Sequence, residues 1–245
     1  MNLRQMASRS KRKFLDLREA RAEQAAYSNY RNIAFLGSED LIQTHFETWS
    51  DPQHLNRPGF EAALRNSNSR PLNIIETGTS AWGTDSTRLW DAYVQHFGGE
   101  LWSVDLSTVP SQRLKKQVSE NTHLIVSDSV AFLQSFAQEH AGMQVDICYL
   151  DSWDVDWQDP VPSMDHGLAE FHAIEKLLKP GSVLLIDDTP MSLEDVPLSE
   201  KEAASSFLAL RGFLPGKGAL IVQELQARSN IRVVWEGYSV ALEFI

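Results

Sequence analysis

Cysteine is almost absent from this sequence. Cys148 stands alone among 245 residues, so it cannot form an internal disulfide, and we expect a reducing, cytoplasmic setting. Long apolar runs are absent too, since none approaches the ~18 residues of a transmembrane helix. The N-terminal stretch lacks the apolar segment of a secretion signal. We therefore expect a globular protein that has no membrane partner.

Positive charge is also scarce. The sequence has 22 Lys and Arg against 33 Asp and Glu, a net charge of −11, which disfavours nucleic acid as a partner. Residues 1–21 are the exception, because this stretch contains seven basic side chains and only two acidic ones. We expect this stretch to belong to an N-terminal helical extension, residues 1–70. Such an extension would form a lid over a ligand site or a contact in a homodimer, and the sequence leaves both alternatives open.

From residue 71 to residue 245, short apolar runs alternate with helical patterns. The predicted strands are Leu72–Ile75, Leu101–Val104, His123–Val126, Val145–Leu150, Val183–Ile186, Ile231–Val234 and Ser239–Phe244. This alternation predicts an α/β domain with a Rossmann-like, seven-stranded, mostly parallel sheet and helices on both faces. Too few residues separate the last two strands for a crossover helix, so we expect a C-terminal antiparallel hairpin.

Acidic residues follow the first five predicted strands. They are Glu76, Asp105, Asp128, Asp151 and the pair Asp187 and Asp188. Open α/β sheets bind ligands beyond this edge, and so many carboxylates repel one another unless hydroxyls, amines or cations lie between them. A single acid at such a position is also typical of a helix cap. The whole set favours a ligand site.

The turn after the first strand contains two glycines and several hydroxyl side chains. Gly78 and Gly83 permit positive φ and a close approach of the backbone, and Ser86 begins the next predicted helix. The Gly-x-Gly-x-x-Gly pattern of dinucleotide-binding proteins is missing, and so is the Gly-Lys-Ser/Thr of phosphate loops. A carboxylate at Glu76 disfavours a pyrophosphate here and favours a nucleoside that carries a positive charge.

Residues 74–87, together with Asp105, Asp151 and the pair Asp187 and Asp188, resemble the class I S-adenosylmethionine-dependent methyltransferases. The similarity extends over residues 71–245. Within that superfamily it is greatest to the small-molecule O-methyltransferases that use a divalent metal, including sugar and macrolide tailoring enzymes. The resemblance implies methyl transfer to a hydroxyl of a small molecule, either a saccharide or a secondary metabolite.

The resemblance also implies which residues hold S-adenosylmethionine. Glu76 and Gly78 would border its methionine part, and Asp105 would accept hydrogen bonds from both ribose hydroxyls. Asp128 and Ser129 would lie beside the adenine amino group, although Asp128 has an alternative role as the cap of the following helix. The rest of the implied cofactor set is Thr79, Ser80, Gly83, Ser86 and Asp151. Gly78 and Gly83 are spaced more widely than in the metal-dependent relatives, which leaves the contacting backbone amides open.

Asp151, Asp187 and Asp188 match the positions of the metal ligands in these relatives. Three carboxylates without cysteine form a hard site that suits Mg²⁺, Mn²⁺ or Ca²⁺. The ion would bind the acceptor hydroxyl, lower its pKa and hold its oxygen in line with the methyl group. In the alternative, Asp151 touches only cofactor or substrate, and Asp187 caps the loop that begins at Thr189.

His166, Asp151 and Asp154 are the candidates for the catalytic residues. We expect His166 in the opening turn of the helix after the fourth strand, where the helix dipole lowers its pKa and favours the neutral form that accepts protons. The alternative for His166 is a solvent-facing or capping role. Asp154 is a further candidate base, in a loop that is acidic overall.

Two other functions are compatible with the same residues. A metal-independent N- or O-methyltransferase of this fold would keep full activity under chelation. A non-catalytic cofactor-binding module would bind S-adenosylmethionine and never release the demethylated product. A nicotinamide-dependent dehydrogenase is disfavoured, because the glycine pattern of dinucleotide-binding proteins is missing.

Overall fold

The computed structural model describes residues 21–80 and 83–245. The chain divides into two compact units, residues 1–34 and residues 35–245. Within the described part of the first unit, residues 21–31 are helical, and the rings of Tyr27 and Tyr30 stack with their centroids 5.8 Å apart. Residues 1–20 lie outside the described residues, so the basic helix expected there stays a prediction.

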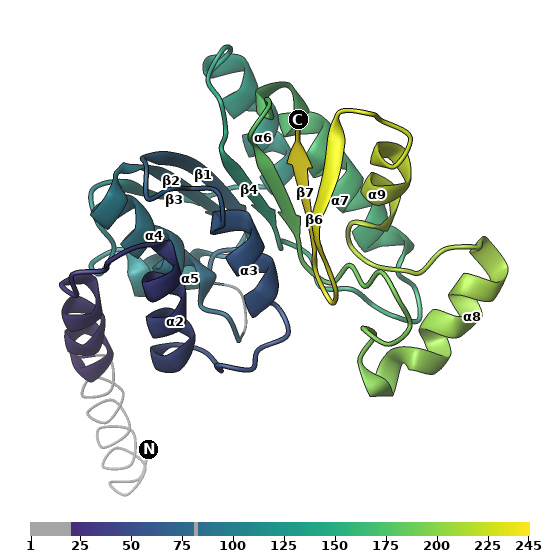
Figure 1. The fold of residues 1–245 in the computed structure, drawn as a ribbon, viewed down its shortest axis with the longest axis horizontal. Helices are drawn as coiled ribbons and strands as arrows, with labels where there is room; N and C mark the ends of the chain where they lie inside the picture. Colours follow the sequence, from purple (N-terminus) through teal and green to yellow (C-terminus); the bar gives the residue numbers. More distant parts are fainter. Residues whose placement is uncertain (1–20, 81–82) are drawn as a thin grey trace, which may run out of the picture. The chain divides into compact units, whose positions relative to one another are not determined.

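A seven-stranded sheet forms the centre of the second unit (Figure 1). Its strands are β1 (Leu72–Thr77), β2 (Gly99–Asp105), β3 (Thr122–Val126), β4 (Ile147–Leu150), β5 (Val183–Ile186), β6 (Ile231–Glu236) and β7 (Val240–Phe244). They are arranged in the order β3-β2-β1-β4-β5-β7-β6. The first five strands are parallel, whereas β7 pairs antiparallel with both β5 and β6. The predicted fold class, including the C-terminal hairpin, is confirmed.

The strand order has its topological switch point between β1 and β4. This strand pairs with β2 on one side and with β4 on the other, so the connections that follow β1 and β4 leave the sheet in opposite directions. In doubly wound sheets, ligands bind at the carboxyl ends of the strands at such a point. The topology therefore directs attention to the turns after β1 and β4.

Helices cover both faces of the sheet. They are α2 (Ser38–Thr48), α3 (Arg57–Leu64), α4 (Ser86–Phe97), α5 (Thr108–Leu114), α6 (Ser129–Glu139), α7 (Val161–Ile174), α8 (Lys201–Arg211) and α9 (Ala219–Leu225), with short 3₁₀ helices η1 (Glu175–Leu177) and η2 (Leu198–Glu200). Figure 1 shows α3, α4 and α5 on one face and α6, α7 and α9 on the other. Residues 35–70 belong to the same compact unit as the sheet. The division at residue 70, with a lid or dimer role for the extension, stays a prediction.

Apolar residues on the two faces of the strands form two packed layers. Cys148 and Leu184 belong to the layer that α6, α7 and α9 cover. On the opposite face, the ring of Phe60 from α3 lies 5.2 Å from that of Trp90 and 5.1 Å from that of Tyr149, measured between centroids. The central strands β4 and β5 are buried at every position, which explains why their sequences are continuously apolar rather than alternating.

The starts of two helices have local causes. Helix α5 begins at Thr108, where the Ser107 side chain accepts a hydrogen bond from the Val109 backbone, 3.2 Å away. Helix α7 begins at Val161, so His166 lies beyond the opening turn in which it was expected. Proline is favourable in a first helical turn, so Pro162 helps to start α7 rather than delaying it.

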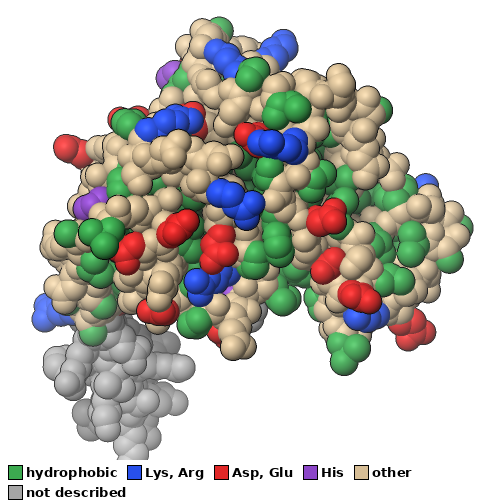
Figure 2. Space-filling model, in the orientation of Figure 1, with side chains coloured by type: hydrophobic (Ala, Val, Ile, Leu, Met, Phe, Trp, Pro, Cys, Tyr) green, Lys and Arg blue, Asp and Glu red, His purple; other side chains and the backbone are tan. Residues whose placement is uncertain are grey.

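Helix α8 is the least buried of the α-helices from α2 to α9. Ala204 is its one fully buried residue. Leu198 just before α8 is 86% exposed and Leu210 within it is 78% exposed. Figure 2 shows apolar side chains at the surface in this part of the molecule. Among residues 21–80 and 83–245, the helices lack the combined length and apolar character needed to cross a bilayer.

The aromatic cluster under α3 predicts a large effect of Phe60→Ala. Phe60 has no exposed surface, so its truncation leaves a cavity between α3 and the sheet. We expect a loss of about 3–5 kcal/mol in the free energy of unfolding, measured by urea denaturation. Leu210→Ala is the control and should change this free energy by less than about 0.5 kcal/mol. Equal effects of the two substitutions would contradict the packing described here.

Candidate functional site

The turn after β1 packs directly against the end of β4. Gly78 has φ +88°, and a side chain at this position would overlap the backbone carbonyl oxygen of Asp151. The Gly78 backbone N–H donates to Val104 O over 2.8 Å, which also ties the turn to β2. Glycine is therefore required here for two reasons, its positive φ and the close approach of two strand ends.

Glu76 lies beneath this turn with no exposed surface. Its carboxylate accepts hydrogen bonds from Ser86 Oγ at 2.5 Å, Thr87 Oγ1 at 2.5 Å and Ser103 Oγ at 2.6 Å. Burial raises the pKa of Glu76 from 4.5 to about 7, although the three hydroxyls oppose the shift. Glu76 and Ser86 thus hold the turn to β2 and α4. Their contact with the cofactor stays a prediction.

Asp105 at the end of β2 faces the same turn. Its carboxylate accepts hydrogen bonds from the backbone N–H of Thr79 at 3.0 Å and from that of Ser107 at 2.6 Å. Thr79 Oγ1 lies 2.9 Å from Ser103 Oγ, which fixes the next part of the turn. The structure therefore brings together Gly78, Thr79 and Asp105, three of the predicted cofactor residues.

The second half of the turn is held by charged and hydroxyl side chains. Ser80 has φ +58°, and its backbone N–H donates to Thr87 Oγ1 over 2.6 Å. The Ser80 hydroxyl donates to Asp85, and Asp85 also accepts from Arg88 at 2.9 Å and from Arg113 at 3.0 Å. These contacts occupy the Ser80 hydroxyl within the protein.

Gly83 makes room for a neighbouring loop. A Cβ at this position would lie 2.9 Å from His54 Nε2, and the Gly83 carbonyl accepts from Ser50 Oγ at 2.5 Å. The adjacent Thr84 carbonyl accepts from His45 Nε2 of α2 at 2.8 Å. The region around α2 thus packs on the turn. Gly83 also has φ +85°, so both its backbone conformation and this packing favour glycine at position 83.

Asp128 caps α6, since its side chain accepts a hydrogen bond from the Ala131 backbone at 2.9 Å. This is the alternative role that the sequence left open. Ser129 Oγ lies 3.0 Å from His166 Nε2. Contacts of Asp128 and Ser129 with adenine stay predictions.

His166 belongs to a polar network between α6, α7 and the end of β4. Besides Ser129, its Nε2 atom lies 3.1 Å from Ser152 Oγ and 3.4 Å from Glu170 Oε1, and the Trp153 ring centroid is 5.1 Å from that of His166. The hydrogen bond with Glu170 raises the pKa of His166 above its ordinary value. The lowered pKa expected from the helix dipole is therefore wrong, because α7 begins at Val161 and His166 follows its opening turn.

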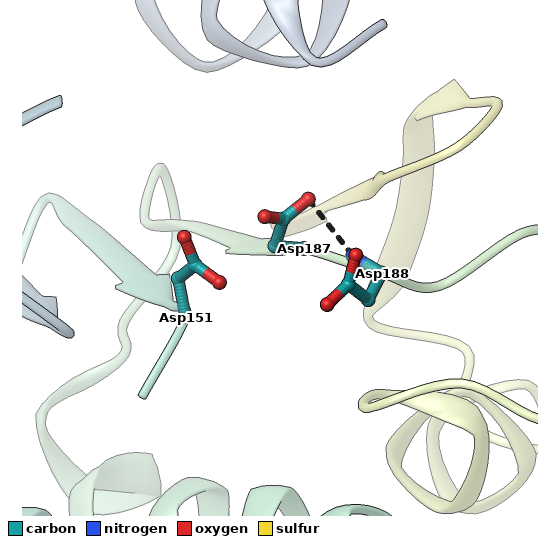
Figure 3. Close-up of side chains that lie close together, drawn as sticks. All are labelled: Asp151, Asp187 and Asp188. Atoms are coloured by element: carbon teal, nitrogen blue, oxygen red, sulfur yellow. Dashed lines mark hydrogen bonds between the residues drawn. The ribbon is translucent and has the colours of Figure 1, made fainter. Parts of the chain in front are cut away.

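Asp151, Asp187 and Asp188 form a cluster at the carboxyl ends of β4 and β5 (Figure 3). One ligand atom from each lies within 4.8 Å of the other two. Asp187 Oδ1 accepts from the Asp188 backbone N–H at 2.8 Å. Burial, and then repulsion between the acids, raises the pKa of Asp187 well above its ordinary value. Burial also raises the pKa of Asp151. The geometry thus concentrates negative charge that a cation would stabilise.

Lys217 supplies one such cation, and the sequence analysis missed it. Its Nζ atom lies 2.5 Å from Asp151 Oδ1 and 3.6 Å from Asp188 Oδ2. Burial would lower the pKa of Lys217, but the aspartates outweigh this effect and raise it. Tyr238 donates to Asp188, and Tyr149 donates to Asp151 Oδ2 over 3.0 Å. The signal that could have identified Lys217 is its position between Gly216 and Gly218.

A cavity of about 610 Å³ opens beside the aspartate cluster. Its walls include the three aspartates, Asp154, Tyr238 and residues between 51 and 56. His54, which the sequence analysis also missed, is part of the last group. Within the described part of the chain, His166 does not line this cavity, whereas Asp154 does. The structure therefore separates the two candidate bases.

Structural comparison identifies the fold. The chain is similar to the MycE methyltransferase of the mycinamycin biosynthetic pathway, in complex with Mg, SAH and mycinamycin VI, with a TM-score of 0.56 and 15% identity over 86% of this chain and 55% of that one. The fold is that of the class I methyltransferases. This chain therefore spans little more than half the length of MycE.

Two further structures are similar to this methyltransferase fold. They are the O-methyltransferase from Bacillus cereus in complex with SAH, with a TM-score of 0.46, 14% identity and coverage of 84% of this chain and 90% of that one, and the SAH-bound Podospora anserina methyltransferase PaMTH1, with a TM-score of 0.46, 14% identity and coverage of 89% and 93%. No protein-family model matches the sequence, and a search of curated proteins finds no match.

Glu76 predicts a pH dependence of stability. Because its pKa rises from 4.5 to about 7 on folding, the folded protein binds more protons than the unfolded chain between these values. Stability therefore falls as the pH rises from 4.5 to 7, and Glu76 accounts for roughly 3 kcal/mol of this fall. Glu76→Gln should remove that part. Urea unfolding of both proteins at pH 5 and pH 8 measures the difference, and parallel losses in the two proteins would contradict the assignment.

Proposed function

We propose that this protein is an S-adenosylmethionine-dependent O-methyltransferase that acts on a hydroxyl of a small molecule, either a saccharide or a secondary metabolite. The observation that carries the proposal is the contact between Gly78 and Asp151, which joins the turn after β1 to the aspartate cavity. A methyl donor at the turn and an acceptor in the cavity would then be neighbours. Proximity of this kind accounts for a large part of the rate in group transfer.

The acidic edge suits a cofactor that carries a positive charge. Asp105 faces the turn with a carboxylate that can accept further hydrogen bonds from ribose hydroxyls. S-adenosylmethionine has a sulfonium group, and it would supply an electrophilic methyl carbon. The residues of the turn and of the cavity would orient the two reactants toward one another.

The aspartate cluster fits a divalent cation as well. Three oxygen donors within 4.8 Å of one another are the ligand type that Mg²⁺, Mn²⁺ and Ca²⁺ prefer. A bound ion would supply Lewis acidity that lowers the pKa of an acceptor hydroxyl. The MycE structure named above contains Mg and SAH together, which supports extending the metal to this chain.

Two side chains of the cavity are suited to the acceptor oxygen. Asp154 lines the cavity, and we assign it the role of proton acceptor. His54 Nδ1 accepts a hydrogen bond from the Asn56 backbone at 3.2 Å, so a neutral ring carries its proton on Nε2 and acts as a donor. Burial lowers the pKa of His54, which favours that neutral form. His166, held by Ser129 and Glu170, would position the cofactor side of the site.

Cofactor binding tests the first part of the proposal. Calorimetric titration with S-adenosylmethionine should detect binding to the wild-type protein and a roughly tenfold or larger loss in Asp105→Ala, because charged hydrogen bonds are removed. Glu139→Ala removes an exposed carboxylate at the end of α6 and should bind normally. The proposal fails if the wild-type protein does not bind this cofactor.

Metal dependence tests the second part. Wild-type protein should bind Mn²⁺ in calorimetry, and Asp187→Asn should bind it at least roughly tenfold more weakly, since a charged ligand is lost. Asp159→Asn, in an exposed loop, is the matched control. Release of SAH in the presence of a panel of glycosides and phenols should stop on chelation. Full activity with EDTA would instead favour a metal-independent methyltransferase, and cofactor binding without turnover on any acceptor would favour a non-catalytic module.

A further inference from the structure

The Lys217 ammonium occupies the interior of the aspartate cluster. Its side chain is 1% exposed, and its Nζ atom contacts Asp151 at 2.5 Å and Asp188 at 3.6 Å. The lysine reaches these acids from the segment between α8 and α9, far from β4 in the sequence. A cation of the chain itself therefore lies where the proposed metal would take its ligands.

The position of Lys217 is fixed by its backbone. Its N–H donates to the Asp188 carbonyl over 2.9 Å, and the N–H of Gly218 donates to Thr189 Oγ1 over 2.9 Å. A side chain at Gly216 would lie 2.6 Å from the Asp188 carbonyl oxygen, and one at Gly218 would lie 2.8 Å from Ile186. Two glycines thus let this segment lie flat against the end of β5. The backbone of this segment therefore fixes the Lys217 ammonium inside the site, and the side chain is not a flexible surface lysine.

We propose that Lys217 competes with the divalent cation for Asp151 and so sets the metal affinity of the cluster. This inference rests on the proposed function, because it concerns the metal of that site. The three carboxylates would carry a charge of −3 when all of them are ionised, and the Lys217 ammonium reduces that negative charge by one. A divalent ion would have to bind beside a buried positive charge at short range, where repulsion is poorly screened. Binding therefore requires Asp151 to exchange the ammonium for the metal.

The competition gives the site a weak affinity for metal in the absence of other ligands. Asp188 is shared in the same way, since it accepts from Tyr238 and also faces Lys217. Asp187 lies beside both acids and is the carboxylate from which an entering ion would begin to displace the lysine. In the alternative, Lys217 only neutralises the aspartates and does not compete with the metal. Replacing its ammonium with a neutral group would then leave the metal affinity unchanged.

Lys217→Met separates these roles, because methionine keeps most of the side-chain volume without the charge. Titration with Mn²⁺ alone, followed by calorimetry, should give roughly tenfold or greater tightening over the wild type. Lys217→Arg retains the charge and should stay within about threefold of the wild type. Lys176→Met removes an exposed lysine beyond the opposite end of α7 and should have no effect.

Thermal unfolding of the same proteins provides a second readout. In EDTA, Lys217→Met should melt at a lower temperature than the wild type, because the acids lose their counter-ion, and Mn²⁺ should restore the melting temperature. If the variant is unfolded in EDTA, it should fold when Mn²⁺ is added. Lys217→Gln, which is neutral but polar, should behave in the same way.

Unchanged or weaker Mn²⁺ binding by both neutral variants would overturn the proposal, and so would a failure of Mn²⁺ to restore their stability. Absence of Mn²⁺ binding in every protein would overturn it too. Titration with S-adenosylmethionine on the same samples keeps this outcome separate from the proposed function. A wild type that binds the cofactor while Lys217→Met shows no gain in metal affinity would reject the competition and retain the methyltransferase. Tighter Mn²⁺ binding by Lys217→Met, without S-adenosylmethionine binding by any of the proteins, would retain the competition and reject the methyltransferase.

Discussion

Gly78 and the Asp151 carbonyl lie in contact at the carboxyl ends of β1 and β4, and much of the site depends on this approach. The Asp151 N–H also donates to the Thr77 carbonyl over 3.0 Å, so the parallel pairing of the two strands continues to the point where their chains diverge. Asp151 is consequently a neighbour of the turn through its backbone and a member of the aspartate cluster through its side chain. A ligand at the turn and a ligand in the cavity cannot be far apart, because one residue borders both.

The buried acids near this contact are stabilised in different ways. Glu76 is surrounded by hydroxyls, which donate hydrogen bonds without adding charge, and its pKa stays raised to about 7. The aspartate cluster has Lys217, so its negative charge is partly balanced by a positive one. The hydroxyl dipoles around Glu76 hold its side chain in one position and do not depend on a bound ligand. The affinity of the aspartate cluster for a cation, in contrast, would change with the position of the Lys217 ammonium. The first arrangement suits a rigid support and the second suits a site that exchanges ligands.

The central strands were predictable from the sequence because they are buried on both faces, so a run such as Val183–Ile186 is apolar throughout. The acids at the strand ends were predictable as a group because parallel strands bring their carboxyl ends to one edge. The contact of Lys217 with Asp151 was not, since the two residues are 66 positions apart, and the glycines beside Lys217 mark its position without indicating its partner. The start of α7 was missed because prolines next to a loop have the same appearance whether they end the loop or begin a helix. That error placed His166 in the wrong turn, and the hydrogen bond with Glu170, which raises the pKa of His166, left no signal in the sequence.

The loop between α2 and α3 connects the two halves of the site. His54 from this loop lies against Gly83 of the turn after β1 and also lines the cavity that holds Asp187 and Asp188. Its Nδ1 atom accepts a hydrogen bond from the Asn56 backbone, which favours one orientation of the ring. A side chain at position 83 would displace the imidazole from the wall of the cavity while leaving the sheet intact. The wide spacing of Gly78 and Gly83 therefore has a physical reason in this chain: the first glycine admits a strand end, and the second admits a histidine from outside the sheet.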